Sequence, residues 1–127
     1  MADAFRSFMA DYAAAFDRFD AAAAAGHFHC PCLLLNGDGA VALTDRTAIE
    51  ANMRALLEDH RRLGFARARV LALRSERLAD RLAIAHVRWR VEGEDGTALG
   101  EWSNSYDLLE TGEGWRIVVS TTHDADV

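Results

Sequence analysis

The chain has 127 residues, of which 50% are hydrophobic and 27% charged, and it contains a single proline. A chain of this length buries enough surface to fold without disulfides, so we expect one globular domain spanning residues 1–127. The net charge of -6 at pH 7 argues against nucleic acid as a partner, because DNA-binding domains present a basic surface to the phosphates.

Nothing in the sequence predicts a secreted or membrane protein. Cys30 and Cys32 lie too close together along the chain for an unstrained disulfide. The first twelve residues carry acidic and basic side chains and lack the apolar core of a signal peptide. No window approaches the roughly 18 apolar residues that a membrane span requires. We therefore expect a cytoplasmic protein that contacts no membrane.

The N-terminal part predicts a helix followed by a short hairpin. Apolar side chains at spacings of three and four predict an amphipathic helix from Asp3 to about Ala24. Gly26 ends this helix, either as a left-handed residue or as a break before a second short turn. Residues 32–36 predict a short buried strand, and residues 40–43 predict its return strand after a tight turn.

The rest of the chain predicts a second helix and four strands. The helix runs from a cap at Thr44 or Asp45 to Leu63, with Gly64 as its stop. Beyond Gly64 the apolar period changes to two, which is typical of strands. The four predicted strands cover residues 65–74, 81–91, 99–109 and 115–122. Helices followed by an antiparallel meander indicate an α+β fold.

Three segments of the chain resemble the nuclear-transport-factor-2-like superfamily. They are residues 47–50 (TAIE), 87–90 (VRWR) and 114–118 (GWRIV). The resemblance covers essentially the whole chain and is closest to the SnoaL-like and ketosteroid-isomerase-like branch. It implies a cone-shaped, cystatin-like fold in which a strongly curved antiparallel sheet wraps around N-terminal helices and leaves a largely apolar pocket. Members of the superfamily include enzymes and non-catalytic binding domains, so the fold alone does not choose between them.

The ketosteroid-isomerase resemblance implies roles for particular residues. That chemistry uses a carboxylate base, a tyrosine on the first helix and a second, neutral acid that donates a hydrogen bond. Tyr12 matches the tyrosine. Asn36 falls at the base position, where an amide cannot accept the proton, and Tyr106 stands where the second acid would be. The chain therefore departs from ketosteroid isomerase unless the nearby Asp38 supplies the base.

The third long strand supplies further pocket candidates. Alternation places Trp102, Asn104 and Tyr106 on one face, which we expect to be concave and to face Tyr12 and Phe16 of the first helix. Apolar walls with a few directed polar groups are typical of a small-molecule pocket. The alternative is an ordinary aromatic core whose buried polar atoms are hydrogen-bonded.

Histidines and cysteines gather between residues 27 and 32. In an extended chain His27 and His29 point to one side while Cys30 and Cys32 point to the other, so four zinc ligands cannot converge. We predict no metal here. The cysteines are expected to fill the core, and His29 to lie at the mouth of the pocket.

Three further histidines stand outside this cluster. His86 and His123, both on predicted strands, are either structural or line the pocket, where their ordinary pKa permits proton transfer near neutral pH. His60 is assigned to the polar surface of the second helix.

The sequence thus predicts a domain that binds a small, largely apolar organic molecule and needs no cofactor. As an enzyme it would carry out isomerisation, cyclisation or dehydration, with Tyr12 and Tyr106 donating to an oxyanion and Asp38 or His29 as the base. The alternative is a non-catalytic ligand-binding or dimerisation module, which the missing acidic pair favours. The resemblance further implies a homodimer that pairs through the convex face of the sheet.

Overall fold

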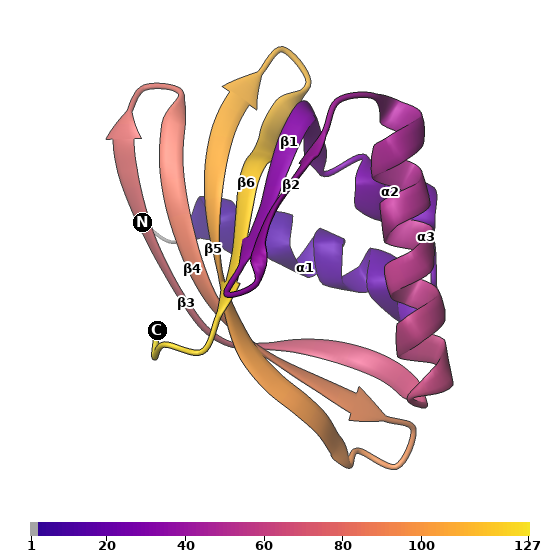
Figure 1. Ribbon diagram of the computed structural model, residues 1–127. Coiled ribbons are helices and arrows are strands. Elements are labelled where there is room, and N and C mark those ends of the chain that lie inside the picture. Colours follow the sequence, from indigo (N-terminus) through magenta and orange to yellow (C-terminus); the bar gives the residue numbers. More distant parts are fainter. Residues whose placement is uncertain (1–2) are drawn as a thin grey trace.

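The computed structural model describes residues 3–127 as three helices packed against one side of a six-stranded sheet (Figure 1). Met1 and Ala2, which belong to the predicted domain, lie outside the described residues. The helices are α1 (Asp3–Asp17), α2 (Ala21–Ala25) and α3 (Arg46–Arg62). The strands are β1 (Phe28–Asn36), β2 (Gly39–Leu43), β3 (Phe65–Ala79), β4 (Leu82–Gly93), β5 (Ala98–Thr111) and β6 (Gly114–His123). The predicted α+β class is confirmed, and none of the helices in the described range is long and apolar enough to cross a membrane.

The first predicted helix is in fact two helices, so the prediction was wrong over residues 18–20. α1 ends at Asp17, and Phe19 has a positive φ of 55°. Asp20 then caps α2 by accepting a hydrogen bond from the Ala23 N–H at 3.0 Å, which satisfies a donor that the first turn leaves free. Gly26 closes α2 with a right-handed φ of -63°, and not as the left-handed residue of one predicted alternative.

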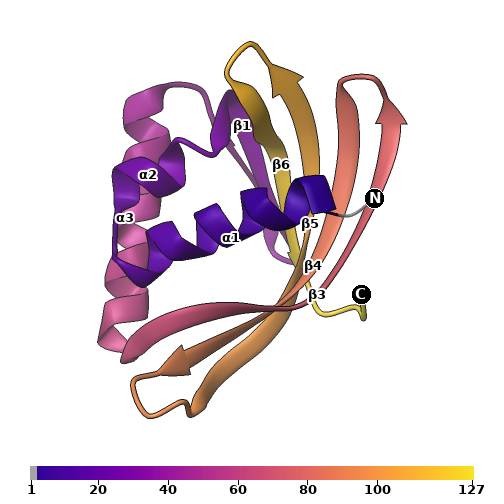
Figure 2. The same cartoon turned by 180° about the vertical axis from the view of Figure 1, so that it is seen from behind.

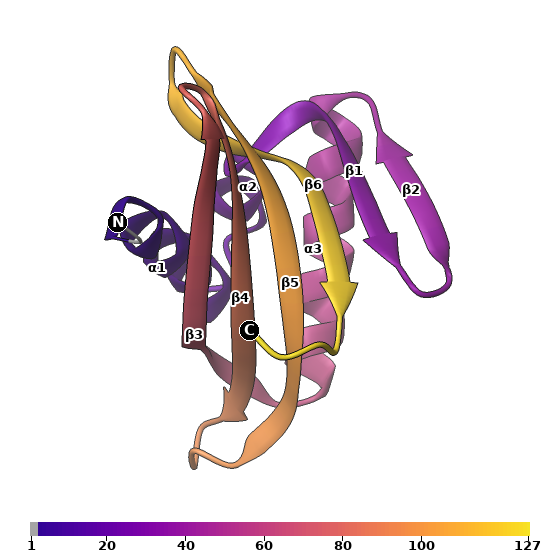
Figure 3. The same cartoon turned by 90° about the vertical axis from the view of Figure 1, so that its left-hand side faces the viewer.

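The sheet is curved and open, with α1 lying across its concave side (Figure 2). Its strand order is β2-β1-β6-β5-β4-β3. Register shifts interrupt the β3–β4, β4–β5 and β5–β6 ladders, and such bulges bend a strand and increase its twist. The three long strands β3, β4 and β5, which lie side by side in Figure 3, bend along their length (Figure 1), and this bend creates the hollow that the helices cover.

One strand pair departs from the predicted antiparallel sheet. β1 and β6 run parallel, whereas the other four pairings are antiparallel. No hairpin links these two strands, so local turn geometry does not dictate their direction. β1 also begins at Phe28, four residues before the predicted start, and includes Pro31. Pairing with β2 starts only at Cys32, so on that side Pro31 needs no N–H for the ladder.

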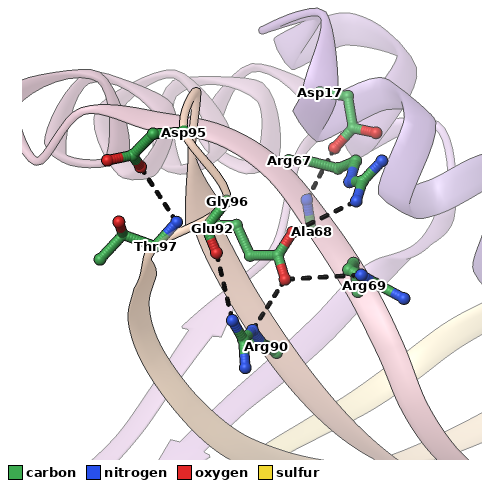
Figure 4. A network of polar contacts seen from close by, with 9 residues as sticks. All are labelled: Asp17, Arg67, Ala68, Arg69, Arg90, Glu92, Asp95, Gly96 and Thr97. Atoms are coloured by element: carbon green, nitrogen blue, oxygen red, sulfur yellow. Dashed lines mark hydrogen bonds and ion pairs between the residues drawn. The ribbon is translucent and has the colours of Figure 1, made fainter.

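A buried carboxylate near the end of β4 is surrounded by three arginines (Figure 4). The Glu92 side chain is 5% exposed and lies 2.7 Å from Arg90 Nε, 3.3 Å from Arg67 Nη2 and 3.6 Å from Arg69 Nη1. These cations offset the cost of burying the charge. Beside them, Asp17 at the end of α1 accepts a hydrogen bond of 2.9 Å from a backbone N–H of β3. This hydrogen bond joins the end of α1 to the sheet.

Candidate functional site

A cavity of about 500 Å³ lies between the helices and the concave face of the sheet. Its size falls within the range that small-molecule sites occupy. Its inner end is formed by buried residues of five elements, Tyr12, Phe28, Trp89, Asn104, Tyr106 and Ser120. Its rim carries the exposed side chains of Asn36, Leu56, Asp59, Leu63 and Thr122. The cavity is therefore closed by aromatic groups at one end and opens between α3, β1 and β6.

Two tyrosines line the inner end of the cavity. The Tyr12 and Tyr106 rings lie 6.2 Å apart between centroids and meet edge to face. Tyr106 accepts a hydrogen bond of 2.9 Å from the Trp89 indole N–H, so its own proton is left to donate elsewhere. The Tyr12 hydroxyl has no hydrogen-bond partner among residues 5–127. Both hydroxyls line the cavity as available donors.

Burial fixes the protonation state of both tyrosines. Desolvation raises the pKa of Tyr12 well above its usual value, and the neighbouring Tyr106 raises it further. Desolvation likewise raises the pKa of Tyr106, against a smaller lowering by the hydrogen bond from Trp89. Because a phenol already titrates near pH 10 in water, both groups remain protonated at neutral pH. They can donate hydrogen bonds and cannot act as bases.

Asn104 donates hydrogen bonds to two further hydroxyl groups that line the cavity. Its amide oxygen accepts from the Trp102 indole N–H at 3.0 Å, and its amide nitrogen donates to Ser120 Oγ at 3.2 Å and Thr122 Oγ1 at 2.9 Å. Both protons of the amide are thereby used, and each hydroxyl accepts one of them. The Ser120 and Thr122 protons are left to donate, so the β6 wall of the cavity also presents donors.

His60 lines the cavity, contrary to the prediction that it lies on the surface of α3. Its Nδ1 lies 3.0 Å from the Leu56 carbonyl oxygen, which can only accept, so Nδ1 carries the proton and the neutral ring keeps a lone pair on Nε2. Burial lowers the pKa of His60, against smaller raising contributions from that hydrogen bond and from Asp59. The ring packs against aromatic side chains of α1, β3 and β5, those of Phe16, Phe65 and Trp102. A sequence signal existed, because position 60 follows Leu56 by one helical turn.

Six of the residues predicted from sequence meet in this cavity. They are Tyr12, Phe16, Asn36, Trp102, Asn104 and Tyr106. Asn36 lies at the rim, where its Oδ1 accepts the backbone N–H of Asp38 at 2.8 Å. The two tyrosines and Asn104 belong to the inner end, and Phe16 and Trp102 line the walls.

Four other predicted residues lie outside the cavity lining. Asp38 is exposed in the β1–β2 turn, beyond the end of the strand whose residues reach the rim. His29 Nδ1 lies 2.8 Å from the Pro31 carbonyl oxygen, outside the cavity lining. His86 and His123 occupy positions whose strand neighbours face inward, so period two turns them to the opposite face of the sheet.

On that outer face the two histidines share one serine. His123 Nδ1 accepts the Ala125 N–H at 3.0 Å, so the proton of its neutral ring lies on Nε2, 2.9 Å from Ser105 Oγ. Ser105 Oγ in turn lies 2.7 Å from His86 Nδ1. Burial lowers the pKa of His86, and Arg74 and His123 lower it further, whereas Glu76 and Asp107 raise it. The chain of hydrogen bonds accounts for both histidines without a ligand.

The histidines and cysteines of residues 27–32 make separate contacts and do not converge on one point. His27 Nδ1 lies 2.8 Å from the Ala23 carbonyl oxygen, Cys32 is buried, and the Cys30 thiol points to the Thr44 carbonyl oxygen at 3.5 Å. Within residues 3–127, no three histidine, cysteine or acidic side chains are placed to hold a metal ion.

A curved, open sheet whose concave side is covered by N-terminal helices, with a cavity between them, defines an NTF2-like fold. Residues 2–125 match the family described as NTF2-like protein (DUF6841), and the chain belongs to this family. The resemblance to the nuclear-transport-factor-2-like superfamily is thereby confirmed. No curated protein matches the chain in sequence.

Solved structures share the fold at low sequence identity. A domain of unknown function with a cystatin-like fold from Nostoc punctiforme is 21% identical, with a TM-score of 0.73 over 98% of this chain and 77% of that one. An NTF-2-like protein of unknown function from Shewanella oneidensis is 11% identical, with a TM-score of 0.77 over 96% and 98%. An NTF2-like protein from Novosphingobium aromaticivorans is 22% identical, with a TM-score of 0.71 over 98% and 81%. These similarities establish the fold, whereas any activity has to be argued from the residues of the cavity.

Proposed function

We propose that the cavity binds a small, largely apolar organic molecule through a carbonyl or similar oxygen acceptor, without a cofactor. The observation that carries this proposal is the pair of protonated hydroxyls of Tyr12 and Tyr106 at the inner end of an aromatic cavity of about 500 Å³. An oxygen buried among apolar groups needs hydrogen-bond donors, because leaving it unpaired is costly. The two tyrosines supply them.

The same donors are suited to chemistry that develops negative charge on that oxygen. Hydrogen-bond donors held in place inside an apolar site stabilise an oxyanion more than water does, because they need no reorganisation during the reaction. Isomerisation, cyclisation and dehydration of a carbonyl compound all pass through such charge. An enzyme of this kind would use Tyr12 and Tyr106 as the oxyanion donors.

A non-catalytic binding module is the second candidate. It is favoured because no carboxylate of residues 5–127 lies at the inner end: Asn36 at the rim carries an amide, and Asp38 is exposed in the turn beyond it. Binding and catalysis share the first requirement, which is that a carbonyl ligand enters the cavity. The test therefore begins with binding.

A matched pair of probes tests the proposal. 2-Acetylnaphthalene carries a carbonyl on a flat aromatic body, and 2-ethylnaphthalene has nearly the same shape without the oxygen. Their binding is followed by the fluorescence of Trp89 and Trp102, which both line the cavity. We expect the ketone to bind more tightly than the hydrocarbon, and Tyr12→Phe to remove roughly a 3- to 10-fold part of that preference, which is the net contribution of one hydrogen bond.

The control for this experiment is Ser105→Ala, which removes a hydroxyl from the outer face of the sheet and should leave both affinities unchanged. Equal binding of the two probes, or a ketone preference that survives both Tyr12→Phe and Tyr106→Phe, would overturn the proposal.

The homodimer and the cytoplasmic location stay predictions. Light scattering of the purified chain tests the first: a mass of twice 14.0 kDa is expected for a dimer.

A further inference from the structure

The cavity presents opposite hydrogen-bonding character at its two ends. The hydroxyls of Tyr12, Tyr106 and Ser120 lie at the inner end, and each has a proton free to donate. At the opening, the lone pair of His60 Nε2 is free to accept, because Nδ1 carries the proton that faces the Leu56 carbonyl oxygen. A donor-rich inner end and an accepting mouth together restrict which ligands fit.

Two of the other accepting groups at the mouth, those of Asp59 and Asn36, are already engaged. Asp59 Oδ1 lies 2.9 Å from Arg62 Nη1, and the Asp59 side chain is 66% exposed, so water competes for it. Asn36 Oδ1 accepts the Asp38 backbone N–H. By contrast, His60 Nε2 has no hydrogen-bond partner in the described part of the chain, and its ring is held between aromatic side chains. A ligand group that reaches His60 is therefore partly shielded from water, which strengthens a hydrogen bond made there.

The two ends are joined by a continuous aromatic wall. The His60 ring lies 5.7 Å from the Phe16 ring, and Phe16 lies 5.1 Å from Tyr12. On the sheet side, Trp102 lies 6.4 Å from His60. A flat aromatic ligand lying along this wall would reach both the tyrosine hydroxyls and the histidine.

Resting on the proposed function, we infer that His60 is a specificity-determining residue, and that the ligand is an aromatic hydroxy-ketone. Its carbonyl oxygen accepts from the tyrosine hydroxyls at the inner end, and a phenolic hydroxyl at its other end donates to His60 Nε2. No covalent change is involved. The site selects hydroxy-ketones because the ligand's carbonyl meets donors at the inner end and its hydroxyl meets an acceptor at the mouth.

Three related probes test this inference. 6-Hydroxy-2-acetylnaphthalene carries both groups, 6-methoxy-2-acetylnaphthalene keeps the oxygen but cannot donate, and 2-acetylnaphthalene lacks the second oxygen. We expect the wild-type chain to bind the hydroxy-ketone roughly 3- to 10-fold more tightly than either of the others, as one hydrogen bond contributes.

Variants then locate the effect. His60→Phe keeps an aromatic ring but no acceptor, and should bind the three ketones equally. His60→Gln restores an acceptor and should recover part of the preference. His123→Phe, on the outer face of the sheet, is the matched control and should behave as the wild type. Circular dichroism confirms that each variant is folded before binding is measured.

The outcomes separate the two proposals. Ketone binding that depends on Tyr12 but shows no preference for the hydroxyl overturns the role of His60 and leaves the proposed function standing. A preference that persists in His60→Phe also overturns it. Failure of all three ketones to bind overturns the proposed function, and the inference with it.

Discussion

The same Tyr→Phe substitution at the two cavity tyrosines should have very different effects on stability. Tyr106 is 2% exposed, and its oxygen is the partner of the Trp89 indole N–H at 2.9 Å, with Trp89 itself 5% exposed. Tyr106→Phe keeps the ring but leaves that N–H unpaired in the core. Leaving a buried donor without a partner costs about 1–3 kcal/mol. Tyr12→Phe removes a hydroxyl that has no protein partner among residues 5–127, so we expect a loss below about 0.5 kcal/mol.

Chemical denaturation measures this difference. Urea midpoints of the wild type and both variants, at a common slope, give the change in unfolding free energy directly. For a chain of this length each kcal/mol corresponds to roughly 3–5 °C in Tm, so thermal scans provide a second measure. Equal losses for the two variants would refute the reasoning, because they would mean that the Trp89 N–H does not depend on the Tyr106 hydroxyl.

Three further predictions concern charged groups. Burial lowers the pKa values of His27, His60 and His86, so the unfolded chain binds protons at these histidines at a higher pH than the folded chain does. The free energy of unfolding should therefore be highest above about pH 6.5 and should decrease as the pH falls below that value. A free energy of unfolding that stays constant from pH 7.5 to 5.5 would contradict this. Glu92→Gln should lower the free energy of unfolding by about 1–2 kcal/mol. This is less than for a fully buried ion pair, because two of the arginine partners of Glu92 are more than half exposed. The same decrease should be measured in 1 M salt. Asp17→Ala should cost about 1 kcal/mol through its lost hydrogen bond to β3, whereas Asp17→Asn, which keeps an accepting oxygen, should cost less than half of that in the same urea titration.

The sheet side of the cavity could be predicted because period two decides which side chains share a face. Trp102, Asn104 and Tyr106 alternate along β5, and all three line the cavity. The same rule, applied to β4, would have turned His86 outward with its neighbour Arg88. On the helix side, the polar character of His60 predicts a surface position, but its place in the sequence continues the buried stripe of α3 formed by Ile49, Met53 and Leu57.

Two features of the fold had weaker or no local signals. Alanine favours helix at every position from 21 to 25, so apolar spacing alone predicts that the first helix continues past Phe19. Asp20, a residue type that commonly caps helices, indicates the start of α2. The parallel pairing of β1 with β6 joins segments more than seventy residues apart, and no spacing within either strand encodes the direction of its partner.

This pairing also determines when the protein can acquire its cavity during synthesis. Leu34 of β1 and Ser120 of β6 are direct partners and form adjacent parts of the cavity wall. Until the last strand leaves the ribosome, β1 has β2 on one side and no neighbour on the other, and the N-terminal hairpin has no other strand to join. Contacts that span so much of the chain form slowly, because a long loop must close before they stabilise it. A chain that stops before Gly114 has the helices and strands β1 to β5 but lacks β6, the strand that joins β1 to β5 and completes the binding wall.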